Sequence, residues 1–255
     1  MDPEKAKKYL ENIEKFRILV IGRGNAGKTT ILQRVCNSVD EPDVFDGEGN
    51  KHGYHKIDDE LVFKSNPGFV FHDSGFEEMK RFVIDHAAAR MLKKCIHAIW
   101  YCIPMTDYHR TVTAAEQKFF NEYDTGHVPV VVLLTKADAL NFAAMEELLD
   151  EELEVEEAEE RATERESLLL EKWQTHIKQI LDKCKFPPKM YLPLTKMHNE
   201  SADCTTLIQS TASALNEEGL QRLLLSTQQS SIGLCIEYAV HWLWVISYKV
   251  WLGVC

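Results

Sequence analysis

The chain of 255 residues is long enough for one large α/β domain with appended segments, and its apolar share of 45% is ordinary for a globular protein. Its formal net charge of −11 leaves no basic surplus to neutralise phosphates, which argues against nucleic acid as a general partner. Much of this charge is local, because residues 146–165 carry 11 acidic and 2 basic side chains, a net of −9.

The cysteines and the N-terminal segment indicate the cellular compartment. Seven cysteines are scattered without a C-x-x-C pair, which suits buried thiols in a reducing compartment better than disulfides or a metal site. Residues 1–15 are charged and amphipathic and lack the apolar run of a secretory signal. We therefore expect a cytoplasmic protein in which an amphipathic helix precedes the main domain.

The first strong pattern is a glycine-rich loop between a strand and a helix. Residues 16–21 (FRILVI) form an apolar run of strand length, and residues 30–35 (TILQRV) have the apolar spacing of a helix. The stretch between them, GRGNAGKT, matches the Walker A motif, whose backbone N–H groups and helix N-terminus hold phosphates. In this motif the lysine contacts the β- and γ-phosphates and the threonine hydroxyl ligates Mg²⁺. We expect Lys28 and Thr29 to be catalytic and the nucleotide phosphates to be bound by Gly22, Gly24, Asn25, Ala26, Gly27, Lys28, Thr29 and Thr30.

Strands and helices alternate along the chain that follows the loop. The expected elements, in chain order, are a polar loop over 37–56, strands over 60–64 and 68–73, a helix over 82–94, a strand over 97–103, a helix over 113–123, a strand over 128–134 and a last strand over 189–194. The runs HAIWYCI and VPVVVLL are uninterrupted, which is typical of central strands that are covered on both faces. This order predicts an α/β fold with a doubly wound, mostly parallel sheet flanked by helices.

An acidic insertion over residues 143–180 interrupts the alternation. The segment is rich in Glu, Leu, Ala and Arg and has few helix breakers, so we expect one long helix or two helices within a main domain over 16–230. Four apolar side chains in it are too sparse for a coiled-coil seam: Leu148, Leu149, Leu153 and Val155. A solvated, projecting helix is the favoured interpretation, and a dedicated protein-docking site is the alternative.

The tetrapeptide Thr135-Lys136-Ala137-Asp138 follows the apolar strand VPVVVLL and indicates which base is bound. A carboxylate at this place accepts two hydrogen bonds, from N1–H and the N2 amino group of guanine. Adenine offers neither donor in that geometry and would leave a desolvated carboxylate unpaired, at a cost of roughly several kcal/mol. We expect Asp138 to select guanine and Lys136 to lay its aliphatic stem along the base.

These motifs in this order resemble a P-loop GTPase of the TRAFAC class. More narrowly, FHDSGFE, IHAIWYCIPMTD, VPVVVLLTKADAL and YLPLTKMH resemble the G-domain-containing proteins of basidiomycete fungi, over residues 16–238 or so. The resemblance implies GTP and GDP as ligands, Mg²⁺ as cofactor and a protein effector or activator of unknown identity. It also implies that Asp73 holds Mg²⁺ through water, and that a backbone N–H near Thr195 and Lys196 contacts guanine O6.

The chain departs from the usual GTPase pattern at the groups that act on the γ-phosphate. The glycine that contacts this phosphate, Gly75, follows Asp73 one residue too early, and no threonine lies between residues 30 and 106 to ligate Mg²⁺ from the first switch. Glu77 and Glu78 stand where a water-orienting glutamine is usual. Hydrolysis by the isolated chain should therefore be slow. Asn25 resembles the asparagine that helps to hold K⁺ in GTPases that this ion activates.

The last segment, residues 231–255, is apolar on nearly every face and contains three tryptophans. Two interpretations stay open: a helix packed on the domain, and contact with a membrane on its cytosolic face. The sequence thus predicts a guanine-nucleotide switch with slow, Mg²⁺-dependent GTP hydrolysis. A GTP-binding scaffold without useful hydrolysis is the first alternative, and an ATP-dependent phosphotransferase is the second.

Overall fold

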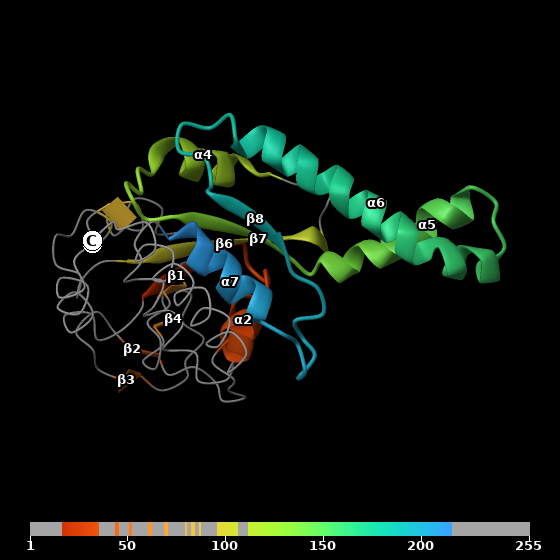
Figure 1. The fold of residues 1–255 in the computed structure, drawn as a ribbon, viewed down its shortest axis with the longest axis horizontal. Helices are drawn as coiled ribbons and strands as arrows, with labels where there is room; N and C mark the ends of the chain where they lie inside the picture. Colours follow the sequence, from red (N-terminus) through yellow and green to blue (C-terminus); the bar gives the residue numbers. More distant parts are fainter. Residues whose placement is uncertain are drawn as a thin grey trace, which may run out of the picture.

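The protein is built around a parallel sheet (Figure 1). The computed structural model describes residues 17–35, 44–45, 51–52, 61–62, 69–70, 80, 83–84, 87, 96–106 and 112–215. Within these residues, four parallel strands pair in the order β1-β6-β7-β8. Their bounds are β1 (Ile18–Gly22), β6 (Ala98–Pro104), β7 (Val130–Thr135) and β8 (Met190–Pro193). Each strand lies within or next to a predicted apolar run, so the predicted parallel α/β sheet is confirmed.

Helices cover both faces of this sheet (Figure 1). Every residue of β6 and β7 is buried, which explains why their sequences are uninterrupted apolar runs. Side chains alternate between the faces, so that Val20 and Trp100 join one core and Ile21 and Tyr101 join the other. The first core includes α2 (Lys28–Val35) and α7 (Thr205–Ala214), and the second includes α4 (Ala114–Glu122) and the end of α6 (Val155–Leu181).

One buried hydrogen bond fastens α7 to the sheet. The indole Nε1 of Trp100 donates to Thr211 Oγ1 at 3.0 Å, and this hydroxyl donates to the Leu207 carbonyl at 2.7 Å. Both side chains are fully buried. Because a buried indole N–H without an acceptor is costly, this bond helps to fix the register of α7 against β6.

Two short antiparallel ladders accompany the main sheet. Strands β2 (Val44–Phe45) and β3 (Lys51–His52) pair with each other, as do β4 (Leu61–Val62) and β5 (Phe69–Val70). The second pair confirms the two strands predicted there, whereas the loop predicted over 37–56 was wrong at β2 and β3. The two paired segments, VF and KH, are only two residues long and stand in a polar, glycine-containing stretch, so the pattern did not reveal them. Residues 83, 84 and 87 are helical, within the helix predicted over 82–94.

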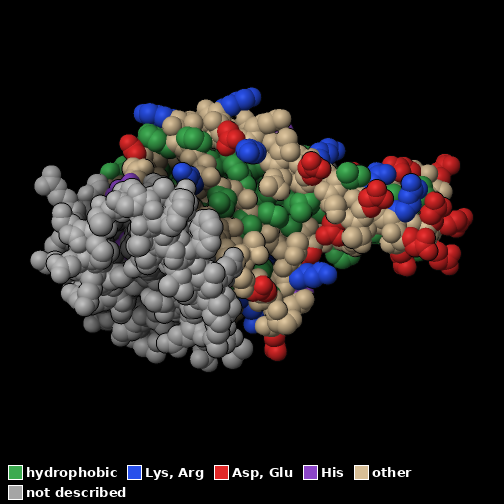
Figure 2. Space-filling view, viewed as in Figure 1, with side chains coloured by type: hydrophobic (Ala, Val, Ile, Leu, Met, Phe, Trp, Pro, Cys, Tyr) green, Lys and Arg blue, Asp and Glu red, His purple; other side chains and the backbone are tan. Residues whose placement is uncertain are grey.

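The acidic insertion forms two helices, α5 (Leu140–Asp150) and α6, which pack as an antiparallel hairpin. The hairpin projects beyond the sheet, and its far end is crowded with carboxylates (Figures 1 and 2). Leu148 packs against Ala158 and Ala162, and the partly buried Met145 and Leu153 lie against this cluster. The small alanines allow the two helices to approach closely. Leu149 lies on the exposed side.

The base and the tip of the hairpin are held in different ways. At the base, Leu140, Ile177 and Leu181 belong to the core beneath the sheet. Nearer the tip, Arg165 bridges the helices by donating to Glu151 at 2.8 and 2.9 Å and to Glu147 at 3.2 Å.

Among the residues that the structure describes, no helix is long and apolar enough to cross a membrane. The predicted helices over 1–15 and 231–255 lie outside the described residues.

Candidate nucleotide-binding site

The glycine-rich loop connects the end of β1 to the start of α2 through a tight reversal. Gly22 has φ +142°, and a Cβ atom placed on it would lie 2.2 Å from the Cys102 carbonyl oxygen on β6. Only glycine fits there, because the backbones of β1 and β6 approach so closely. Asn25 and Gly27 also have positive φ values, 57° and 76°, which turn the chain into the helix. Ala26 is buried between them, and Gly24 is exposed.

The ammonium group of Lys28 lies within this loop. Its Nζ donates to the Gly22 carbonyl at 2.9 Å and to the Arg23 carbonyl at 2.6 Å. Thr29 and Thr30 follow in the first turn of α2 and are half-buried. The N–H groups of a helix's first turn have no acceptor within the helix and carry partial positive charge. The loop therefore combines a fixed cation, a helix N-terminus and small residues, which is the arrangement that binds phosphate.

A partly buried ion pair, which was not predicted from the sequence, joins the loop to α4. Arg23 Nε donates to Glu116 Oε1 and Arg23 Nη2 donates to Glu116 Oε2, both at 2.8 Å. The Glu116 side chain is 1% exposed and also accepts from the backbone N–H of Thr113 at 2.6 Å, in a capping box at the start of α4. The pattern T-x-x-E signals such a cap. No local signal indicates that the same carboxylate holds an arginine 93 residues away.

A second group of predicted residues meets where β7 and β8 end. Lys136 is exposed and has a left-handed backbone with φ 54°, which turns the chain so that the Ala137 N–H donates to the Leu194 carbonyl at 3.0 Å. Asp138 Oδ1 accepts from the backbone N–H of Lys196 at 2.8 Å. The turn that carries Asp138 is thus fastened to the turn that carries Thr195 and Lys196, both of which are exposed.

Two further features belong to this pair of turns. Arg34, at the end of α2, donates to the Met197 carbonyl at 3.2 Å and to the His198 carbonyl at 3.3 Å, which ties the helix of the glycine-rich loop to the second turn. Sequence reasoning gave no sign of this link. The Thr135 hydroxyl is buried and has no hydrogen-bond partner among the described residues. A buried polar group of this kind is normally satisfied by water or a ligand.

The sheet brings the two halves of the site to one edge. Because β1, β6, β7 and β8 are all parallel, the glycine-rich loop and the turns of Asp138 and Lys196 all follow carboxyl ends of strands. Only β6 separates β1 from β7, so their ends are about 10 Å apart at the usual strand spacing. Lys28 and Asp138 therefore both lie beyond the carboxyl ends of strands, on the same side of the sheet.

The hydrogen bond between Asp138 and Lys196 bears on how a base would enter. The Lys196 N–H is the group expected to contact guanine O6, and here it is directed to the Asp138 carboxylate instead. For one base to use both groups, this N–H has to turn from the carboxylate to the base oxygen. The two turns thus place a backbone donor and a carboxylate acceptor side by side.

The described part of the site suits Mg²⁺ only in combination with phosphate. Thr29 contributes a hydroxyl, and the described residues contain no cluster of three His, Cys, Asp or Glu side chains that would hold a metal. Mg²⁺ accepts a donor set of few protein oxygens together with substrate phosphates and water, so the residues present fit this ion. Asp73 and Gly75 lie outside the described residues.

Cys102 lies behind the loop and is fully buried. Burial raises the pKa of its thiol to about 12, and the positive charge of Lys28 opposes this shift. A thiol with such a pKa stays protonated and unreactive at neutral pH. Cys102 is therefore a packing residue of the sheet beneath the loop.

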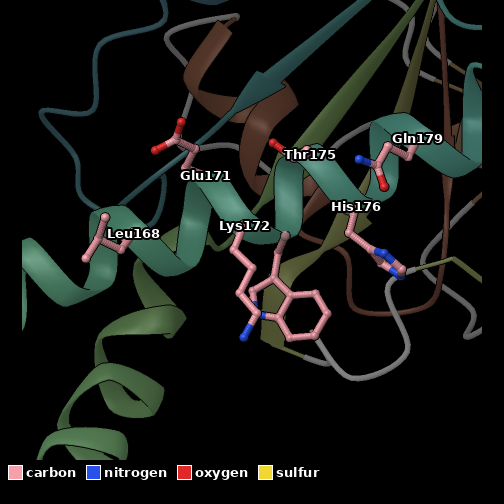
Figure 3. Close-up of a pocket in the computed structure, with 7 residues that line it drawn as sticks. Leu168, Glu171, Lys172, Thr175, His176 and Gln179 are labelled. Atoms are coloured by element: carbon pink, nitrogen blue, oxygen red, sulfur yellow. The ribbon is translucent and has the colours of Figure 1, made fainter.

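A hollow of about 480 Å³ on α6 is another candidate for a binding site, but its polar side chains do not point towards a common position. Figure 3 shows Glu171 and Thr175 leaving the helix on one side, and Lys172 and His176 leaving it on the other. Polar groups at a ligand site point to a common position, whereas these diverge. The glycine-rich loop and the two turns are the better candidate.

Comparisons with known proteins identify the family to which the chain belongs. Curated protein sequences give no match. Among solved structures, the chain is similar to the ADP-ribosylation factor-like GTP-binding protein, small COPII coat GTPase SAR1, of Encephalitozoon cuniculi in complex with GDP. That likeness has 18% sequence identity and a TM-score of 0.42, over 89% of this chain and 91% of the other. The model of the ADP-ribosylation factor family matches residues 4–182. The chain therefore belongs to the ADP-ribosylation factor (Arf) family of small GTP-binding proteins, which act as GTPase switches.

Proposed function

We propose that this chain binds GTP and GDP across the edge described above and hydrolyses GTP slowly, with Mg²⁺, as a regulated switch. The observation that carries the proposal is the meeting of Asp138 with Lys196 on the same sheet edge as Lys28. A loop that binds phosphate alone would serve any nucleotide. A carboxylate and an N–H held 2.8 Å apart beside it support recognition of guanine.

In this proposal the residues of the glycine-rich loop divide the work on the phosphates. The ammonium of Lys28 contacts the β- and γ-phosphates and stabilises negative charge as the γ-phosphoryl group leaves. Backbone N–H groups over residues 24–30 surround the β-phosphate. Thr29, with Asp73, would hold Mg²⁺, which neutralises charge on the phosphate oxygens when bound. Gly75 would contribute a backbone N–H to the γ-phosphate.

At the base, Asp138 accepts two hydrogen bonds from guanine, and Lys136 covers one face of the ring. The N–H of Lys196 and the neighbouring Thr195 lie at O6. The buried hydroxyl of Thr135 stands at the same turn and gains a polar neighbour when the site fills.

The first experiment identifies the nucleotide and tests both anchors. The protein is purified gently, its bound nucleotide is identified, and fluorescent GDP is displaced with GTP or ATP. Lys28→Ala should abolish nucleotide retention, with Lys172→Ala on α6 as the matched control. Asp138→Asn should shift preference towards xanthine nucleotides, because the amide reverses one donor–acceptor pair. Asp124→Asn is its control, since Asp124 holds a turn before β7 at the opposite edge of the sheet. Unchanged guanine affinity in Asp138→Asn would refute the assignment of the base site.

A GTP-binding scaffold without useful hydrolysis is the second candidate function. It is favoured by the absence of a threonine between residues 30 and 106 and of a glutamine after Gly75. Single-turnover GTP cleavage, measured in K⁺ and in Na⁺, separates the two candidates. Cleavage in either salt supports the switch, and stimulation by K⁺ alone supports a role for Asn25 in holding the cation. If ATP displaces fluorescent GDP as effectively as GTP does, the phosphotransferase alternative is favoured.

The cellular setting rests on residues beyond the described part. We propose that residues 231–255 contact the domain or the cytosolic face of a membrane, and the sequence predicts an amphipathic helix over residues 1–15. The narrower resemblance to fungal G-domain-containing proteins is likewise part of this proposal. Flotation of the full chain with vesicles, compared with a chain ending at residue 230, tests the membrane contact.

A further inference from the structure

The ion pair between Arg23 and Glu116 joins the glycine-rich loop to a helix that has no other assigned role. Both guanidinium–carboxylate contacts measure 2.8 Å, and the arginine side chain is 19% exposed. Two parallel contacts fix the orientation of the guanidinium plane as well as its position. The pair is therefore a directional link between the loop and the start of α4.

Arg23 also occupies the central position in the hydrogen bonding of the loop itself. Its carbonyl oxygen accepts from Lys28 Nζ at 2.6 Å and from the Ala26 N–H at 3.3 Å. Its side chain is held by Glu116, and its neighbours on either side are glycines. One residue thus connects the rigid start of α4 to the lysine that contacts phosphate.

The loop needs such a restraint because its backbone is permissive. Gly22, Gly24 and Gly27 lack a Cβ atom, which lets the loop backbone adopt many conformations when no phosphate is bound. Ordering them on binding costs conformational entropy, and a contact that orders them beforehand reduces that cost. The same contact slows the opening of the loop when nucleotide leaves.

We infer that Glu116 is a positioning residue that controls how long nucleotide is retained, acting through Arg23 on the glycine-rich loop. This inference rests on the proposed function of the loop. The charge of Arg23 is neutralised by Glu116 in this arrangement, so Arg23 positions the loop and does not serve as a phosphate ligand.

Dissociation of fluorescent GDP, measured by stopped flow in excess GDP, tests the inference. Glu116→Gln and Arg23→Met should each accelerate dissociation by about tenfold or more, because each removes one charge of a partly buried pair and leaves the other charge uncompensated. The double variant should resemble the single variants, since the second change removes a contact that is already lost. Slower dissociation in Glu116→Gln would overturn the inference, because it would mean that a released Arg23 binds phosphate.

Two control variants separate retention from general damage. Glu151→Gln breaks the similar bidentate pair with Arg165 on the hairpin and should leave the dissociation rate unchanged. Thr113→Val removes the capping hydroxyl of α4 but leaves the Arg23–Glu116 pair and should change the rate by less than about twofold. Thermal melting shows whether each variant is folded. If Glu116→Gln does not fold, Arg23→Met decides the question alone.

The outcomes distinguish this inference from the proposed function. Failure of the wild-type chain to bind any guanine nucleotide would remove the proposed function, and the inference with it. Tight binding by the wild-type chain, with unchanged dissociation from both single variants, would overturn the inference alone.

Discussion

Replacing single glycines of the nucleotide loop separates backbone strain from steric overlap. Gly22, Gly24 and Gly27 lie within six residues of one another but face different surroundings. A Cβ on Gly22 would meet Cys102 atoms at 2.2, 2.9 and 3.0 Å, and its φ of +142° is one that other residues rarely adopt. Gly27 has φ +76° with nothing within 4 Å, and Gly24 has neither restriction.

The expected loss of stability follows from these differences. In Gly27→Ala only the backbone is strained, which costs about 1–2 kcal/mol. Gly22→Ala adds overlap with a backbone carbonyl, which relaxes only if the ends of β1 and β6 separate. Overpacking costs about 1–3 kcal/mol and the strained φ a similar amount, so the variant should lose about 2–6 kcal/mol. Gly24→Ala should be neutral or slightly stabilising, because alanine restricts the unfolded chain.

Urea unfolding without nucleotide, and again with saturating Mg²⁺·GDP, measures each variant. Since ligand binding adds its own stabilisation, the difference between the two series reports whether the loop still binds. We expect the order Gly24→Ala, Gly27→Ala, Gly22→Ala from most to least stable, with little nucleotide-dependent stabilisation in the last. A Gly22→Ala protein as stable as Gly24→Ala would refute the close approach of the loop to Cys102.

Two further expectations concern the hairpin and the buried thiol. Leu148→Ala should destabilise the tip of the hairpin by about 2–5 kcal/mol, because Leu148 is 1% exposed, whereas Leu149→Ala at 42% exposure should change it by less than about 0.5 kcal/mol. Hydrogen exchange of α5 and the first half of α6 measures both, and equal protection in the two variants would contradict the packing of Leu148 against α6. The pKa of Cys102 rises from 9.0 to about 12 on burial, so the folded protein keeps a proton that the unfolded chain releases. The resulting contribution to the free energy of unfolding is complete below about pH 9 and is lost as the pH rises towards 12. In urea titrations, the free energy of unfolding should therefore fall more steeply with pH for the wild-type protein than for Cys102→Ala. Parallel curves for the two proteins would contradict this.

The sequence was most informative where local pattern and burial coincide. Continuous apolar runs predicted β6 and β7 because both strands are covered on two faces, and the helix predicted over 113–123 is α4, which begins at the capping residue Thr113. The predicted parallel sheet also placed the Walker A loop and the turn of Asp138 at the same edge, since both segments follow the carboxyl ends of strands.

Features set by distant contacts could not be predicted in this way. Arg23 meets Glu116 across 93 residues, and Arg34 meets Met197 across 163, so both pairs depend on the completed topology. The packing of Leu148 against Ala158 and Ala162 was not predicted because alanines carry little apolar weight in a pattern, although their small size lets α5 and α6 approach. The short ladder of β2 and β3 depends on backbone pairing that a polar sequence does not reveal.

The hairpin has a mechanical consequence for the base site. The helix α6 has 27 residues and extends for about 40 Å, while α5 begins two residues after Asp138, and β8, which follows α6, ends two residues before Thr195. The arm thus begins beside the turn of Asp138, and the end of α6 is anchored in the core by Ile177 and Leu181. A protein that bound the acidic tip would act on the Asp138 turn through α5, while α6 would pass the same force to the core of the sheet.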